Sequence, residues 1–201
     1  MEGDLIFLEN KTSDAKAIKL ITGSRFNHLG IIMKYRGKFI VLETNNIVRR
    51  TELPQFLKKG VKNEYLVKRF KDYKNILVED NLRKLREVAN IYIGKPYDLY
   101  YGWGDEKIYP SELIWKVIKD ALNIEIAKLK KMKDYDLSNP YVKLIISQKF
   151  GKEIPLDEDT IFPRDILDSD LLTTVFPKNP EDLEGPPNLQ EMNIEEDIKK
   201  E

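Results

Sequence analysis

The chain has 201 residues, of which 41% are hydrophobic and 34% charged, the balance expected of one ordinary folded domain. Its 34 basic residues cancel 34 acidic ones, so no net charge argues for nucleic acid or an anionic membrane as a partner. With no cysteine and a single histidine, the composition excludes disulfides, thiol catalysis and the usual zinc sites. No phosphate-binding glycine loop is present, so we expect neither a metal nor a cofactor.

The pattern of the first seventy residues predicts mainly strands. Residues 4–9 form an apolar run typical of a buried strand. Ser13 is the predicted N-cap of a helix that passes through Ile21 and stops at Gly23. The elements expected next are two strands joined around Arg36 and Gly37, a third strand after residues 45–46, a short helix opened by Pro54 and a strand over residues 63–70.

The pattern of the second part of the chain predicts mainly helices. Apolar residues recur at helical spacing from Asn75 to Ile93, and Gly94 ends that pattern. An aromatic, turn-rich connector leads to a helix from Pro110 to about Leu122. Two further helical segments are expected, over residues 138–151 and 162–172. The fold class is therefore α+β, with a mainly antiparallel sheet in the first third and helices packed against it.

The composition changes after Phe176. Residues 177–201 contain four prolines and eight acidic residues against three lysines. Such a segment buries too little apolar surface to offset the entropy of ordering. We therefore expect one domain over residues 1–176 and a flexible acidic, proline-rich tail over residues 177–201.

Neither a leader nor a membrane span is predicted in the sequence as given. Its first ten residues lack a basic segment followed by an apolar run, and no later apolar run approaches ~18 residues. A chain trimmed after a signal peptide would look the same, so the compartment stays open. The residues say nothing of the oligomeric state.

Few side chains are candidates for chemistry. His28 begins a predicted strand and Glu43 ends the next, where a carboxylate either faces solvent or orients a neighbouring imidazole. Asp105 and Glu106 are two adjacent acids without other obvious cation ligands. The lysine-rich residues 128–133 lack interleaved aromatic residues and are most simply a solvated face.

Five segments in chain order resemble one known family: GDLIF, AIKLITGSRFNHLGIIM, FIVLET, GKPYDLYYGWGDEKIYPSELIWK and FPRDIL. The set is similar to the YiiX-like permuted papain-fold hydrolases, relatives of the NlpC-type cell-wall peptidases, and the resemblance runs from about residue 3 to residue 174. In these proteins a circular permutation puts the nucleophile helix after the histidine strand. The resemblance implies a cysteine, histidine and polar-residue triad that acts on amide or ester bonds.

The same resemblance assigns positions in this chain. It places the histidine at His28 and the orienting residue at Glu43. The family's cysteine lies in a tyrosine-cysteine-serine-glutamate run, which corresponds here to residues 109–112, Tyr-Pro-Ser-Glu. The cysteine position is therefore Pro110, between Tyr109 and Ser111.

A proline at this position removes two functions while suiting the helix. It supplies neither a nucleophile nor the backbone N–H that donates to the oxyanion. Its fixed φ angle nevertheless favours the first helical position. Helical geometry puts Pro110 on the core-facing side and turns Ser111 off to one side.

Three functions remain open. The first is an inactive homologue that binds a small amide-, amino-acid- or acyl-containing ligand, related to cell wall or lipid, in the former active-site cleft. Its walls would be Tyr109 and the connector residues Tyr97, Tyr100, Tyr101 and Trp103. The second is an active amidase, peptidase or esterase that uses Ser111 with His28 and Glu43; activation of water by His28 and Glu43 is a further variant of catalysis. The third is a scaffold whose acidic tail recruits a basic partner.

Overall fold

The structure is a computed structural model, and it describes residues 1–12, 14–151 and 153–177. Its strands are β1 (Leu5–Leu8), β2 (His28–Tyr35), β3 (Lys38–Thr44), β4 (Val48–Glu52), β5 (Tyr65–Phe70), β6 (Lys130–Lys131), β7 (Asp159–Thr160) and β8 (Leu172–Phe176). Its α-helices are α1 (Ala15–Thr22), α2 (Leu53–Leu57), α3 (Tyr73–Ile76), α4 (Glu79–Tyr92), α5 (Pro110–Leu122), α6 (Pro140–Phe150) and α7 (Pro163–Leu167), with 3₁₀ turns η1 (Val61–Asn63) and η2 (Met132–Asp134). All but the first residue of the predicted tail, residues 177–201, lies outside the described residues.

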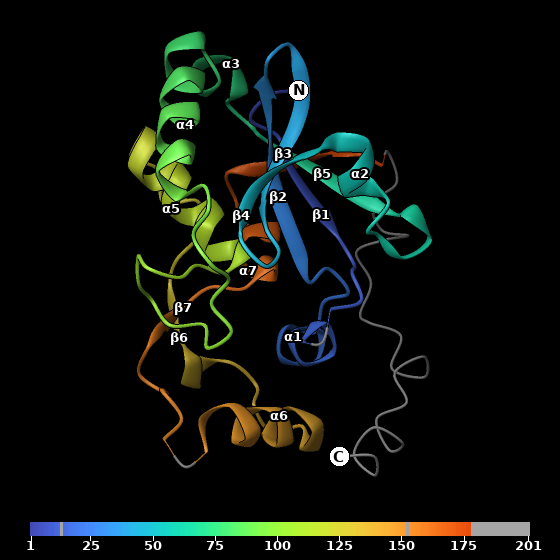
Figure 1. Ribbon diagram of the computed structural model, residues 1–201, viewed down its shortest axis with the longest axis vertical. Helices are drawn as coiled ribbons and strands as arrows, with labels where there is room; N and C mark the ends of the chain where they lie inside the picture. Colours follow the sequence, from blue (N-terminus) through green and yellow to red (C-terminus); the bar gives the residue numbers. More distant parts are fainter. Residues whose placement is uncertain (13, 152, 178–201) are drawn as a thin grey trace.

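One antiparallel sheet organises the molecule. Its six strands follow the order β4-β3-β2-β1-β5-β8, and β6 pairs separately with β7. The β2–β3 turn uses Arg36 at φ 49° and Gly37 at φ 77°. Two successive positive φ values match the twist of a two-residue hairpin, which fixes the register of Tyr35 opposite Lys38. The first strand of the chain therefore lies inside the sheet, between β2 and β5 (Figure 1).

Each face of the sheet has its own apolar layer, because side chains alternate along a strand. The larger layer lies between the sheet and the helices α4 and α5, which pack side by side (Figure 1). The smaller one lies on the opposite face, where Phe56 of α2 contacts the sheet residues. The larger layer comprises, among others, Leu5, Phe7, Leu29, Ile31, Leu42, Leu113, Ile114 and Val117; the smaller comprises Ile6, Leu8, Ile32, Val41, Phe56 and Val67.

The architecture confirms the α+β prediction of a mainly antiparallel sheet packed against helices. The helix from Pro110 to Leu122 is confirmed at both ends. The single helix expected over residues 75–93 is wrong at its start, because Val78 is extended at ψ 158° and separates α3 from α4. The expected helical segment 162–172 ends at Leu167, and Leu172 instead begins β8, which pairs with β5.

Helix α1 begins differently from the prediction. Its N-cap is Asp14, whose side chain makes no capping hydrogen bond, and Ser13 lies outside the described residues. The predicted end is confirmed, since Gly23 is left-handed at φ 62°. Within the described part of the chain, no helix combines the length and the apolar character that crossing a membrane requires.

Candidate active site

His28 and Glu43 meet across the neighbouring strands β2 and β3. Nε2 of His28 lies 2.9 Å from Oε2 of Glu43, and both side chains are buried. An ionised carboxylate only accepts hydrogen bonds, so Nε2 carries a hydrogen and donates a hydrogen bond to Glu43. The lone pair is then on Nδ1, which is the ring nitrogen able to act as a base.

Glu43 is held by several donors besides the imidazole. Its Oε1 accepts hydrogen bonds from Thr51 Oγ1 and Lys59 Nζ. Burial alone would raise the pKa of the Glu43 carboxyl, but the hydrogen bond and electrostatic attraction of His28, together with Lys59 and Thr51, lower it from 4.5 to about 2. Glu43 is therefore ionised at neutral pH and fixes the orientation of the imidazole.

The sheet presents these residues at the ends of its strands. His28 and Glu43 lie on the α2 face, where the imidazole stacks on the Phe56 ring with centroids 5.6 Å apart. Their chain neighbours Leu29 and Thr44 point to the opposite face, towards α5. A cavity at the strand ends is therefore within reach of side chains from both faces.

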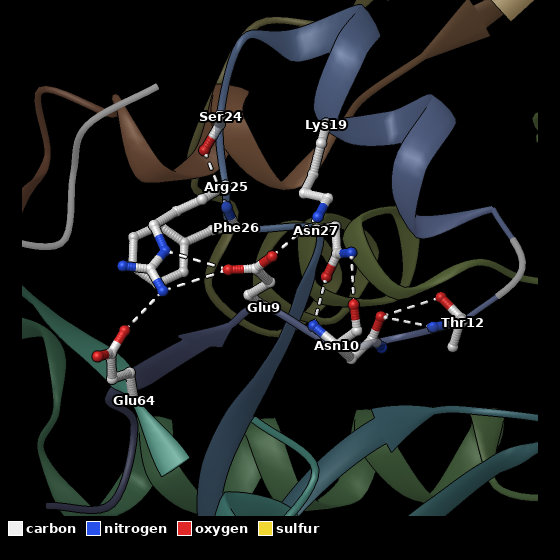
Figure 2. A network of polar contacts seen from close by, with 9 residues as sticks. All are labelled: Glu9, Asn10, Thr12, Lys19, Ser24, Arg25, Phe26, Asn27 and Glu64. Carbon is white, nitrogen blue, oxygen red and sulfur yellow. Dashed lines mark hydrogen bonds and ion pairs between the residues drawn. The ribbon is translucent and has the colours of Figure 1, made fainter. Parts of the chain in front are cut away.

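The segment before His28 is anchored by a polar network, shown in Figure 2. The Asn27 carboxamide accepts from the backbone N–H of Asn10 at 2.9 Å and donates to its carbonyl at 3.1 Å. Arg25 pairs with Glu9 at 3.2 Å and with Glu64 at 2.6 Å. These contacts tie the start of β2 to the end of β1, so they limit how far the His28 backbone can move.

A cavity of about 320 Å³ lies beside this pair. That volume suits a small ligand. The cavity is lined from the loop after β1, from the ends of β2 and β3, from the connector before α5 and from the starts of α5 and α7. The lining residues used below are Asp14, His28, Thr44, Asn45, Asn46, Lys59, Tyr97, Tyr101, Tyr109, Pro110 and Ser111.

Helix α5 starts in the cavity wall. Tyr109 is its N-cap and Pro110 occupies the first turn. The Ser111 hydroxyl is buried and donates to the backbone carbonyl of Ile161 at 2.7 Å. Ser111 therefore lines the cavity with its hydroxyl engaged by the segment before α7.

Glu112 completes the helix start. Its carboxylate accepts from the backbone N–H of Gly104 at 3.2 Å and of Tyr109 at 3.4 Å, and lies 2.9 Å from Lys116 Nζ. The same ammonium also pairs with Asp105 at 2.8 Å. Burial raises the pKa of Glu112 from 4.5 to about 7, because these contacts offset its desolvation only in part. Glu112 supports the backbone around the helix start.

A carboxylate and two phenols form another part of the cavity wall. The Tyr97 hydroxyl donates to Asp14 Oδ2 at 2.9 Å, and the Tyr101 hydroxyl donates to the same oxygen. Burial opposes ionisation of Asp14, yet the two phenols and the nearby Lys149 lower its pKa. Burial and the Asp14 charge raise the pKa of both tyrosines, so they remain protonated donors.

The structure brings most of the sequence-predicted residues together. The cavity is lined by His28, Tyr97, Tyr109, Pro110 and Ser111, among others. Glu43 is not one of these lining residues and is hydrogen-bonded to His28. Trp103 is not among the described residues that line it: its ring packs against Trp115 with centroids 5.3 Å apart.

Several site residues were missed by reasoning from the sequence. Asp14 was missed because it lies far from Tyr101 along the chain, and the two residues meet only in the fold. Thr51 and Lys59 hold Glu43 from β4 and from the turn after α2. The sequence carries no spacing signal for these contacts. The β3–β4 register puts Arg49 opposite Glu43, where the two pair at 3.6 Å, and places Thr51 two residues further along the same face, opposite Val41.

Two comparisons with known proteins give the same relative. The uncharacterized protein YiiX of Escherichia coli strain K12 is 37% identical over 173 residues, which cover 86% of this chain and 84% of YiiX. The crystal structure of YiiX from Escherichia coli O157:H7 matches with a TM-score of 0.83 at 37% identity, covering 87% of this chain and 96% of that one. That YiiX structure is described as one of a metalloprotein.

The described residues of this chain gather no group of side chains typical of a metal site. Among residues 1–12, 14–151 and 153–177, no three histidine, aspartate or glutamate side chains gather as a metal site would require. The acids Asp105 and Glu43 are both paired with lysines.

The family comparison covers the whole described domain. Residues 1–176 match the model of the permuted papain-like amidase enzymes YaeF/YiiX, the C92 family. That range contains every strand of the sheet as well as the cavity between His28 and the start of α5. The chain belongs to the permuted papain-like amidase family and has its circularly permuted papain-like fold.

Proposed function

We propose that this family member binds a small amide-, amino-acid- or acyl-containing ligand in the cavity and does not cleave it. The single observation that carries this proposal is Pro110, which lies in the first turn of α5 and lines the same cavity as His28. On this view Pro110 occupies the position of the family's nucleophilic cysteine.

The chemistry of proline supports the absence of hydrolysis. A cysteine at the start of this helix would attack as a thiolate, stabilised by the positive helix end and a neighbouring imidazolium. Its backbone N–H would also donate to the developing oxyanion, and loss of one such donor costs about 10²-fold or more in rate. Proline lacks both groups, so the His28–Glu43 pair has no thiol to activate.

Hydrolysis by Ser111 is the second candidate, because this residue also lines the cavity. Its hydroxyl donates to the Ile161 carbonyl at 2.7 Å. Attack on a substrate requires that proton to pass to a base, which means breaking the bond to Ile161 first. Its engaged hydroxyl supports the binding function over serine catalysis.

The decisive experiment restores the missing thiol. Pro110→Cys should gain turnover of activated aryl esters and stoichiometric labelling by iodoacetamide, while wild type and the matched control Pro110→Ala show neither. Adding His28→Ala to the Cys variant should abolish turnover. Turnover by wild type would contradict the proposal; its loss in Ser111→Ala would assign it to serine, and its loss only in His28→Ala to activated water.

Ligand binding is tested by thermal shift. Amino acids, muropeptides and acyl amides are screened against wild type, and a true ligand raises the melting temperature with the logarithm of its concentration once that concentration exceeds Kd. If none of these compounds shifts the melting temperature, the binding function is wrong.

Truncation after Phe176 tests the scaffold alternative. Unchanged partner pull-downs would eliminate a role for the tail.

A further inference from the structure

Thr44 stands out in the cavity wall. It ends β3, directly after Glu43, and is 1% exposed. Among the described residues, its Oγ1 is the buried side-chain polar atom that has no hydrogen-bond partner. The residue also lines the cavity, beside Asn45 and Asn46.

An unpaired buried hydroxyl is expensive, because it loses water without gaining a partner. The other hydroxyls around the site are engaged: Thr51 donates to Glu43, Ser111 to the Ile161 carbonyl, and Tyr109 accepts from the Ile161 N–H at 3.2 Å. Valine has nearly the shape of threonine and would avoid the cost. The cavity is therefore the place from which a missing partner would come.

The surroundings of Thr44 indicate the kind of partner. Two charged groups of the wall are already engaged, Asp14 by the phenols of Tyr97 and Tyr101, and Lys59 by Glu43. Lys11, on the loop after β1, also lines the cavity. Asn45 and Asn46, which follow Thr44, are neutral carboxamides that also line the cavity. This part of the wall therefore matches a neutral polar group better than a charged one.

We propose that the Thr44 hydroxyl is a ligand-binding group that hydrogen-bonds a neutral amide of the molecule bound in the cavity. This inference rests on the proposed binding function and names the group recognised. Thr44 is then a specificity residue: ligands that present an amide at this point bind more tightly than ligands that present an apolar group or an ester there.

The first test uses the free protein and matched substitutions. Thr44→Val should raise the melting temperature by about 2–4 °C, because it removes an unsatisfied hydroxyl. Thr51→Val, the same change at a hydroxyl bonded to Glu43, should lower it. A lower melting temperature for Thr44→Val would overturn the inference, since it would reveal a structural partner for Oγ1.

The second test uses ligands that differ at one atom. A panel of N-acyl amino-acid amides and the matching methyl esters is compared on wild type, Thr44→Val and Thr44→Ser by thermal shift. The amide should give a larger thermal shift than the matching ester on wild type and on Thr44→Ser. On Thr44→Val the two shifts should be equal. Equal shifts on wild type and Thr44→Val would overturn the role of Thr44 alone, whereas no shift on any protein would overturn the proposed binding function.

Discussion

Two glutamates, one on each side of the cavity, are equally buried and behave in opposite ways. Glu43 and Glu112 are both 0% exposed and both contact a lysine. The pKa of Glu43 falls to about 2, while that of Glu112 rises to about 7. The difference lies in their other donors. Glu43 receives an imidazole and a hydroxyl besides its lysine, whereas Glu112 receives two backbone N–H groups at 3.2 and 3.4 Å and shares its lysine with Asp105.

This contrast separates the site into two functional parts. On the strand side, the contacts stabilise a charged carboxylate that orients an imidazole, as a base requires. On the helix side, the polar groups serve the backbone of the helix start and the segments packed on it. Under the proposed function, the strand side keeps the residues that would move a proton, and the helix side serves the stability of the fold.

The largest effect is expected from Glu43→Ala. It leaves the Lys59 ammonium, the Thr51 hydroxyl and the imidazole without their shared acceptor. Breaking one partner out of a buried ion pair typically costs about 3–5 kcal/mol, and we expect a loss of that size in urea unfolding at pH 7. Glu43→Gln keeps the shape and should lose less. A loss below about 1 kcal/mol would mean that these contacts hold little of the fold together.

The pH dependence of stability should show one limb for each glutamate. Because the folded-state pKa of Glu43 is lowered, its contribution is present above pH 4.5 and is lost as the pH falls towards about 2. Because that of Glu112 is raised, stability is lost as the pH rises from 4.5 to about 7. Each limb corresponds to about 3 kcal/mol, since one pKa unit is worth about 1.36 kcal/mol.

Chemical denaturation across pH 2 to 8 measures both limbs. Glu112→Gln should flatten the limb between pH 4.5 and 7 and leave the acidic limb unchanged. Glu43→Gln should do the reverse. If one variant flattened both limbs, the two carboxylates would titrate as one coupled system and the contrast between the two sides would fail.

The smallest effect is expected from Ser111→Ala. Loss of its hydrogen bond to the Ile161 carbonyl should lower the free energy of unfolding by about 1 kcal/mol. Under the proposed function, ligand-induced thermal shifts should be unchanged by this variant. Thr160→Ala, which removes another buried hydroxyl behind Tyr109, serves as a control for general damage to this region. If Ser111→Ala kept its stability but lost ligand binding, Ser111 would be a functional residue of the site.

Prediction from the sequence succeeded where structure is local. The strands around Arg36 and Gly37 and the helix between Pro110 and Leu122 follow from turn chemistry and apolar spacing, and both are confirmed. The break at Val78 was missed, because the helical spacing continues through it while the Asn81 side chain bonds the Ile76 carbonyl at the end of α3. Strand β8 was missed because half of it is exposed and its pairing partner, β5, lies about a hundred residues earlier.

The candidate site was foreseen in its outline only. Pro110 and His28 were singled out from the sequence, and both line the cavity. The carboxylate-phenol group at Asp14 was not foreseen, because Asp14 is separated along the chain by 83 residues from Tyr97 and by 87 from Tyr101. Long-range side-chain contacts of this kind carry no periodicity, so spacing cannot reveal them.

The position of β8 has a consequence for how the chain is made. β5 receives β1 on one side early, but its other neighbour is supplied only by residues 172–176. During synthesis, the ribosome therefore delivers five adjoining strands long before the sixth, and β5 presents an open row of backbone donors and acceptors throughout that interval. In a nascent chain halted before Leu172, the edge of β5 would stay free to pair with strands of other chains.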